Sequence, residues 1–202
     1  MANSLYDGDL PDSFDAGGSV AIDTEATGLR FVRDRLCLVQ VSAGDGHASL
    51  VRIEREQSEA PNIAKILEDP SILKIFHFAR FDVALLYKTF GVLASPVYCT
   101  KIASKIARTY SNQHGLNILT NELLNLELSK EKQSSDWGSG DLSDAQIQYA
   151  ANDVLHLHGL RAELDRILER EGRAELAAAC FEFIPARAKL DLGGWPEDVF
   201  AH

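Results

Sequence analysis

Residues 19–31 read SVAIDTEATGLRF and join a short apolar run to two acidic side chains. Val20, Ala21 and Ile22 predict a buried β-strand, with Asp23 and Glu25 at its carboxyl end. Side chains two residues apart on a strand lie on one face, so the two carboxylates share a face of the predicted sheet. α/β sheets commonly place ligand sites at this end of their strands, although two solvated acids in a surface turn would give the same local pattern.

The segments around this strand predict alternating strands and helices. Residues 34–46 and 47–53 predict a β-hairpin, because apolar residues flank a glycine-containing turn. A long helix is predicted to begin at Ser143, where the sequence fits a capping box. The other predicted elements are strands at 71–78 and 95–100 and helices at 61–69, 79–91, 100–108, 115–126, 143–172 and 174–183. This order predicts an α/β domain with a mixed central sheet flanked by helices.

The composition indicates an ordinary globular protein. The 202 residues are 46% hydrophobic, enough to bury a core without disulfides or structural metals. Cys37, Cys99 and Cys180 lie far apart, so we expect free thiols in a reducing compartment. The sequence has no apolar run of the roughly 20 residues that a membrane span needs, and its N-terminus lacks a secretory pattern. We therefore expect a cytoplasmic protein that does not bind membranes.

The charge balance restricts the kind of substrate. The net charge is −10, whereas proteins that hold long duplexes through many phosphates normally carry a basic face. An acidic protein can still act on a phosphodiester if bound metal ions neutralise the local charge or if the substrate is short.

Two further acids stand in apolar surroundings. Asp82 lies within FHFARFDVALL, residues 76–86, and Asp153 within QYAANDVLHL, residues 148–157. Tyr149 precedes Asp153 by four residues, so a helix places the phenol and the carboxylate on one face. Each acid alone would also suit an ordinary amphipathic helix. If all four acids converge, two divalent cations, Mg²⁺ or Mn²⁺, would offset their repulsion and could promote hydrolysis of a phosphodiester.

The segments AIDTEATGL, FHFARFDVALL and YAANDVLHL resemble, in order and spacing, the three motifs of the DEDD superfamily of 3′→5′ exonucleases. Tyr149 resembles the tyrosine of one branch, and KEKQSSDWGSG, residues 130–140, resembles a loop of ribonuclease D. The similarity covers residues 19–171 and is closer to the small nanoRNase C type than to ribonuclease D proper, which continues into helical domains. It implies a ribonuclease H-like exonuclease fold, with an N-terminal segment at 1–18, the exonuclease domain at 19–183 and an extended C-terminal arm at 184–202, packed on its own or a neighbouring subunit.

The resemblance also implies a role for each matching residue. The implied metal ligands, which are also catalytic, are Asp23, Glu25, Asp82 and Asp153. Tyr149 is the implied catalytic residue that orients the attacking water. The implied substrate-binding residues are Thr24, Gly28, Leu29, His77 and Arg80. Leu29 matches a wedge near the 3′-terminal base, whereas Arg80 would equally suit an exposed helix start. Ala26 replaces the last residue of the more usual DTET, a position that is not a ligand.

The resemblance implies a metal-dependent 3′→5′ exoribonuclease that cleaves short oligoribonucleotides, dinucleotides above all, to 5′-mononucleotides. One alternative is a broader 3′→5′ exonuclease acting on longer RNA or on DNA. Another is an inactive nucleic-acid-binding protein on the same fold, which the presence of all four acids and the tyrosine disfavours. Members of the nanoRNase C type form octameric rings, so the resemblance also implies a homo-oligomer.

Overall fold

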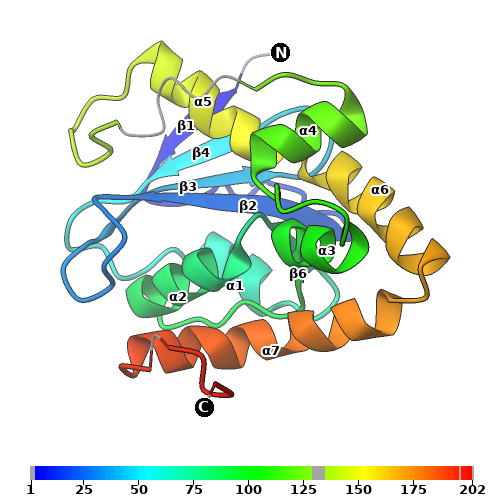
Figure 1. The fold of residues 1–202 in the computed structure, drawn as a ribbon. Helices are drawn as coiled ribbons and strands as arrows, with labels where there is room; N and C mark the ends of the chain where they lie inside the picture. The colour runs from blue at the N-terminus through cyan, green and yellow to red at the C-terminus, as the bar shows by residue number, and fades with distance from the viewer. Residues whose placement is uncertain (1–2, 129–134, 196, 202) are drawn as a thin grey trace.

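The computed structural model describes residues 3–128, 135–195 and 197–201 and contains one six-stranded sheet with the order β1-β4-β3-β2-β5-β6 (Figure 1). The strands are β1 (Ser4–Asp7), β2 (Ser19–Ala26), β3 (Leu36–Ser42), β4 (Ser49–Arg52), β5 (Leu73–Phe76) and β6 (Val97–Cys99). Strand β3 is antiparallel to both of its neighbours, β2 and β4. Strands β5 and β6 continue the sheet parallel to β2, and β1 lies parallel to β4. The predicted mixed sheet is confirmed.

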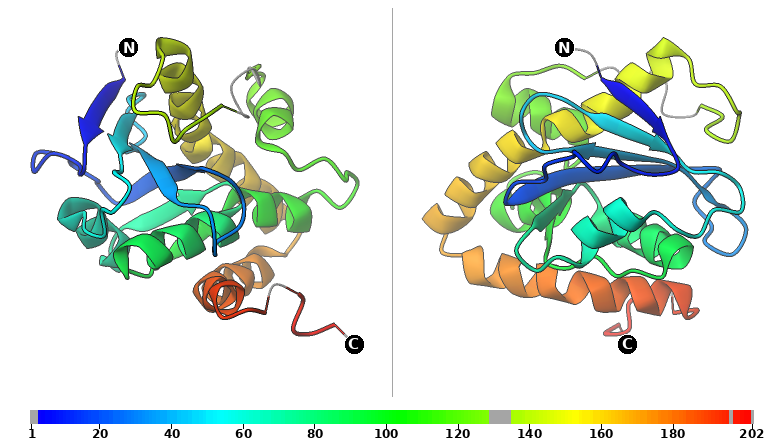
Figure 2. Two further views of the ribbon diagram at one scale, coloured as in Figure 1. Left: turned by 90° about the vertical axis from the view of Figure 1, so that its left-hand side faces the viewer. Right: turned by 180° about the vertical axis from the view of Figure 1, so that it is seen from behind.

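Seven helices among the described residues surround this sheet. They are α1 (Pro61–Glu68), α2 (Ala79–Phe90), α3 (Thr100–Ala107), α4 (Leu116–Leu124), α5 (Asp144–Leu155), α6 (Leu157–Arg170) and α7 (Ala174–Leu192). Helices α1 and α2 lie on one side of the sheet and α5 on the other, while α7 runs beneath α2 (Figures 1 and 2). None of the described helices is long and apolar enough to cross a membrane.

Alternation along β2 divides the core into two layers. Val20 and Ile22 are buried with the side chains of α1, α2 and α7, whereas Ala21 is buried with those of α5 and α6. Asp23 and Glu25 continue the series of Ala21, so they face the α5 side of the sheet. The strand thus turns its acidic end toward the helix that carries Asp153.

The predicted helix over residues 143–172 is two helices. Helix α5 ends at Leu155 and α6 begins at Leu157, with His156 between them at φ −107° and ψ −3°. No proline or glycine occupies these three positions, so no local signal marks the break. Leu157 and Leu160 are fully buried after the break, which shows that packing on the sheet directs the second helix.

The chain ends contribute more to the domain than predicted. Helix α7 continues to Leu192, so the prediction of an extended arm from residue 184 is wrong for its first nine residues. Pro185 interrupts the helical hydrogen bonds, but Ile184 and Ala188 are buried in the core and offset this cost. At the other end, β1 lies within residues 1–18, which were predicted as a separate segment, and pairs with β4 at the sheet edge.

Candidate active site

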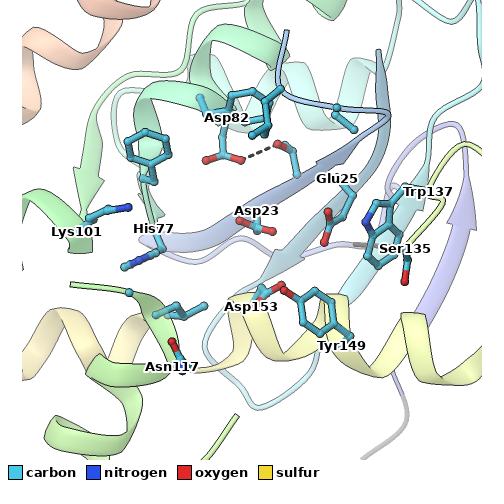
Figure 3. Close-up of a pocket in the computed structure, with 18 of the residues that line it drawn as sticks. Asp23, Glu25, His77, Asp82, Lys101, Asn117, Ser135, Trp137, Tyr149 and Asp153 are labelled. Carbon is cyan, nitrogen blue, oxygen red and sulfur yellow. Dashed lines mark hydrogen bonds between the residues drawn. The ribbon is translucent and has the colours of Figure 1, made fainter. Parts of the chain in front are cut away.

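A cavity of about 800 Å³ lies at the carboxyl ends of β2, β5 and β6, the edge where parallel strands place ligand sites. Its wall includes residues from β2, from the turn after β5, from α3 and from α5. In the close-up, carboxylates occupy the middle, with His77 and Lys101 on one side and Ser135 and Trp137 on the other (Figure 3).

Three carboxylates form a tight cluster in this cavity. Oxygen atoms of Asp23, Glu25 and Asp153 all lie within 4.8 Å of one another. The first two come from β2, and the third comes from α5, which crosses one face of the sheet beside them (Figures 1 and 3). The register of β2 against β3 shifts directly after Glu25, an irregularity that re-aims side chains beside active sites.

The fourth predicted acid lies beside this cluster. Asp82, in the first turn of α2, is 3% exposed and lines the same cavity. Its Oδ1 atom accepts a hydrogen bond of 2.6 Å from the Thr24 hydroxyl (Figure 3). The structure therefore brings together all four acids from three separate parts of the chain, and Thr24, predicted to bind substrate, orients one of them.

Burial and mutual repulsion disfavour ionisation of these acids. Burial raises the pKa of Asp23 well above its usual range, and the charges of Asp82, Asp153 and Glu25 raise it further. Burial, followed by repulsion from Asp153 and Asp82, raises the pKa of Glu25 to about 9. Burial also raises the pKa values of Asp82 and Asp153 to about 7. Such a group of oxygen donors is stabilised by hard divalent cations, so the chemistry of the donors fits Mg²⁺ or Mn²⁺.

Tyr149 stands one helical turn before Asp153 and lines the cavity. Burial, and then the charges of Asp153, Glu25 and Asp23, raise the pKa of the Tyr149 phenol, which therefore remains protonated at neutral pH. Hydrogen bonding from this phenol lowers the pKa of Asp153 and opposes the effect of burial there. Trp137, 5% exposed, packs against Tyr149 with 6.2 Å between ring centroids. The phenol is thus a fixed hydrogen-bond donor.

Three predicted substrate-binding residues also line the cavity. Leu29 is 80% exposed despite its apolar side chain. The preceding Gly28 lies so close to Asp34 that a Cβ atom would clash with that carboxylate, which also accepts a hydrogen bond from the Arg30 backbone. Burial, with a smaller contribution from Lys101, lowers the pKa of His77 to about 3, so its ring is neutral.

Arg80 lies elsewhere. Its guanidinium forms two hydrogen bonds of 2.6 Å with the carboxylate of Asp191 on α7, and it lines a smaller cavity of about 190 Å³ between α2, α3 and α7. Its position joins the start of α2 to α7. Three residues that were not predicted as site residues also line the large cavity: Lys101, Asn117 and Phe78. Lys101 follows β6 by two residues, so the rule that strands place ligand sites at their carboxyl ends could have identified it.

The KEKQSSDWGSG loop is only partly described. Residues 129–134 lie outside the described residues, whereas Ser135 and Trp137 line the cavity. Helix α5, which follows the loop, begins with the predicted capping box: Ser143 and Gln146 each hydrogen-bond to the backbone of the other. This cap fixes the start of the helix that carries Tyr149 and Asp153.

Comparison with known proteins places the chain in a family. A family model described as 3′-5′ exonuclease matches residues 9–169. Ribonuclease D of Granulibacter bethesdensis is 36% identical over 154 residues, which are 76% of this chain and 38% of that protein. The chain spans about two fifths of the length of the curated ribonuclease D relatives that it matches.

Solved structures also match over the whole chain. Brucella melitensis NrnC bound to pGG is 53% identical, with a TM-score of 0.96 and coverage of 100% of this chain and 99% of that one. NrnC of the same organism with bound Mg²⁺ is 52% identical, with a TM-score of 0.95 and full coverage of both chains. These likenesses confirm the ribonuclease H-like exonuclease fold and the ribonuclease D-like, nanoRNase C type of resemblance. The chain therefore belongs to the 3′-5′ exonuclease family of nucleases.

Proposed function

We propose that this chain is a divalent-metal-dependent 3′→5′ exoribonuclease that hydrolyses short oligoribonucleotides, dinucleotides above all, to 5′-mononucleotides. The observation that carries this proposal is the convergence of four acids in one cavity. Among the described residues that line it, four carboxylates face a single cationic side chain, that of Lys101. Carboxylates held so close without cations would repel one another, which supports metal binding as their purpose.

In this proposal Asp23, Glu25, Asp82 and Asp153 hold two divalent ions. When bound, such ions activate water and stabilise negative charge on the attacking and leaving oxygens of a phosphodiester. The protein holds the carboxylates in place before substrate arrives, through the strand β2, the Thr24 hydrogen bond to Asp82 and the capped helix α5. This preorganisation lowers the cost of assembling the charged transition state.

Tyr149 orients the attacking water. Because its pKa is raised, the phenol at neutral pH is a hydrogen-bond donor and acceptor and not a general base. Its position supports this role, since the phenol lies beside Asp153 at the carboxylate cluster and hydrogen-bonds to it (Figure 3).

Several observations support a short RNA substrate. The cavity of about 800 Å³ lies within the range that encloses a small ligand. The net charge of −10 disfavours extended contact with a polyphosphate chain. The similar Brucella protein was solved with pGG, a short oligonucleotide. The exposed Leu29 is suited to pack against the terminal base.

We also propose a homo-oligomer that acts in the cytoplasm. Trp195 and Phe200, near the C-terminus, are 60% and 80% exposed within one chain, and a neighbouring subunit would cover such apolar surface. The three cysteines Cys37, Cys99 and Cys180 are free, as expected in a reducing compartment. Light scattering of the purified protein measures the oligomer, for which an octamer is expected.

A direct assay tests the activity. Purified protein is given 5′-labelled RNA and DNA of two, seven and twenty nucleotides with Mg²⁺, Mn²⁺ or EDTA. We expect metal-dependent release of mononucleotides, fastest from the RNA dinucleotide. Asp153→Asn should abolish cleavage, whereas Asp144→Asn, the same change at an exposed acid in the first turn of α5, should not. Faster cleavage of the 20-nucleotide RNA or of DNA would favour the broader exonuclease, and no cleavage of any substrate would refute the enzyme.

A further inference from the structure

Phe78 has a left-handed backbone conformation at the start of α2. Its φ of 71° and ψ of 41° are values that a bulky side chain rarely adopts. Phe76 and Ala79 on either side are fully buried, but the Phe78 side chain is 46% exposed. The unfavourable backbone turn therefore coincides with an aromatic ring presented at the surface between two core residues.

Phe78 lies between two cavities and lines both the large one and the smaller one. It follows His77 in the chain, and the Nζ atom of Lys101 stands 4.4 Å from the ring centroid. In the close-up, His77 and Lys101 mark the end of the cavity opposite Trp137, with the carboxylates between (Figure 3). Phe78 thus supplies an apolar surface at the end where the only cation of the described lining stands.

Strained backbone conformations persist where the surroundings impose them, and they cluster at sites that hold ligands. Here the Phe78 carbonyl accepts the first hydrogen bond of the helix, 3.1 Å from the Phe81 backbone nitrogen. A glycine or asparagine would satisfy the same backbone at lower cost. The presence of phenylalanine therefore indicates a use for the ring itself.

We infer that Phe78 is a base-stacking residue: its ring packs against a nucleobase of the bound oligonucleotide. Aromatic rings stack on any base, because every base presents a π-face. Lys101 packs against the ring as a cation–π partner and holds it in place. The inference rests on the proposed function, and it adds a substrate contact to those that the resemblance implies for Leu29 and His77.

Three variants at this position separate stacking from structural support. Phe78→Gly removes the ring and relieves the backbone, Phe78→Leu keeps apolar bulk without a π-face, and Phe78→Tyr keeps the ring. Phe183→Leu is the matched control, since Phe183 is a comparably exposed phenylalanine that lines the smaller cavity and not the large one. The measurements are KM and kcat for an RNA dinucleotide, its affinity in Ca²⁺ by calorimetry, and Tm.

For Phe78→Gly and Phe78→Leu we expect KM and Kd to rise about tenfold or more, with kcat changed by less than about threefold. Phe78→Tyr and Phe183→Leu should stay close to the wild type, and Phe78→Gly should not lower Tm. Two further probes are dinucleotides that each lack one of the two bases. The one without the base that stacks on Phe78 should bind wild type and Phe78→Gly equally, which a purely structural role would not produce.

The inference is overturned if Phe78→Leu keeps the wild-type KM, or if Phe78→Gly lowers Tm and leaves dinucleotide affinity unchanged. An equal loss of affinity in Phe183→Leu would also overturn it, because the effect would then come from the neighbouring cavity or from subunit contacts. If the wild type itself neither binds nor cleaves a dinucleotide, the proposed function fails instead.

Discussion

Replacing Thr24 by Val tests the claim that the fold orients Asp82 before metal binds. The two side chains have nearly the same shape, so the change removes one hydroxyl from a residue that is 7% exposed. That hydroxyl donates the 2.6 Å hydrogen bond to Asp82, and this bond lowers the pKa of Asp82 against the larger, opposing effect of burial. Without it, the Asp82 pKa should rise above its present value of about 7.

The magnitude follows from the charge on the acceptor. A hydrogen bond to a charged group contributes roughly 1.5–3 kcal/mol, which corresponds to about one to two pKa units. Because a metal ion must displace the proton, and Asp82 is already about half protonated at pH 7, affinity for Mg²⁺ or Mn²⁺ at that pH should fall about 5- to 50-fold. Both proteins are more fully ionised at pH 8.5, so the difference should shrink there.

Isothermal titration calorimetry at pH 7.0 and 8.5 measures the metal affinity of wild type and Thr24→Val. The control is Thr89→Val, which removes a hydroxyl that donates to the Leu85 carbonyl within α2, away from the carboxylates. The reasoning is refuted if Thr24→Val binds metal like the wild type at pH 7.0, or if Thr89→Val loses as much affinity.

Three further predictions concern catalysis, pH and the α7 contact. Tyr149→Phe should lower kcat about 100-fold, because it removes the donor that orients water, and should change metal affinity far less. Single-turnover assays measure the first quantity and calorimetry the second. Equal losses of kcat and of metal affinity would contradict that role. Since the pKa of Glu25 is raised to about 9, the folded state binds more protons than the unfolded state between about pH 4.5 and 9. The Tm in EDTA should therefore fall as pH rises through this window, and saturating Mg²⁺ should reduce the fall. A Tm in EDTA that rises with pH would contradict the raised pKa of Glu25. Asp191→Ala removes the buried carboxylate that pairs with both Arg80 and Arg187. It should lower the free energy of unfolding, measured in urea, by about 3–5 kcal/mol. Glu175→Ala, at an exposed acid on α7, should change the free energy of unfolding by less than about 0.5 kcal/mol. A similar loss in both variants would refute the stabilising role of the ion pairs at Asp191.

The sequence predicted the elements whose signals are local. Apolar runs and their spacing predicted β2, the β3–β4 hairpin and α2, and the capping box at Ser143 predicted the start of α5. The motif spacing named the four acids and Tyr149, which the structure brings into one cavity. Their convergence was implied by the resemblance of three segments to the exonuclease motifs, because residue types alone would also suit ordinary amphipathic helices.

Other features depended on contacts between distant segments. The break at His156 and the continuation of α7 past Pro185 follow from burial of Leu160 and Ile184, which no local pattern indicated. Strand β1 has only four residues and exists because β4 offers it an edge.

The sequence by itself determined which groups are available for chemistry, since ligand type and spacing along a strand or helix are properties of the chain. The tertiary structure alone decided what each group faces. In the folded chain Thr24 donates a hydrogen bond to Asp82, and Arg80 forms an ion pair with Asp191. Phe78 and Lys101 lie together on the cavity wall. Pairings between residues far apart in sequence depend on how helices pack across the sheet, and that geometry minimises the free energy of the whole core, not of any one segment.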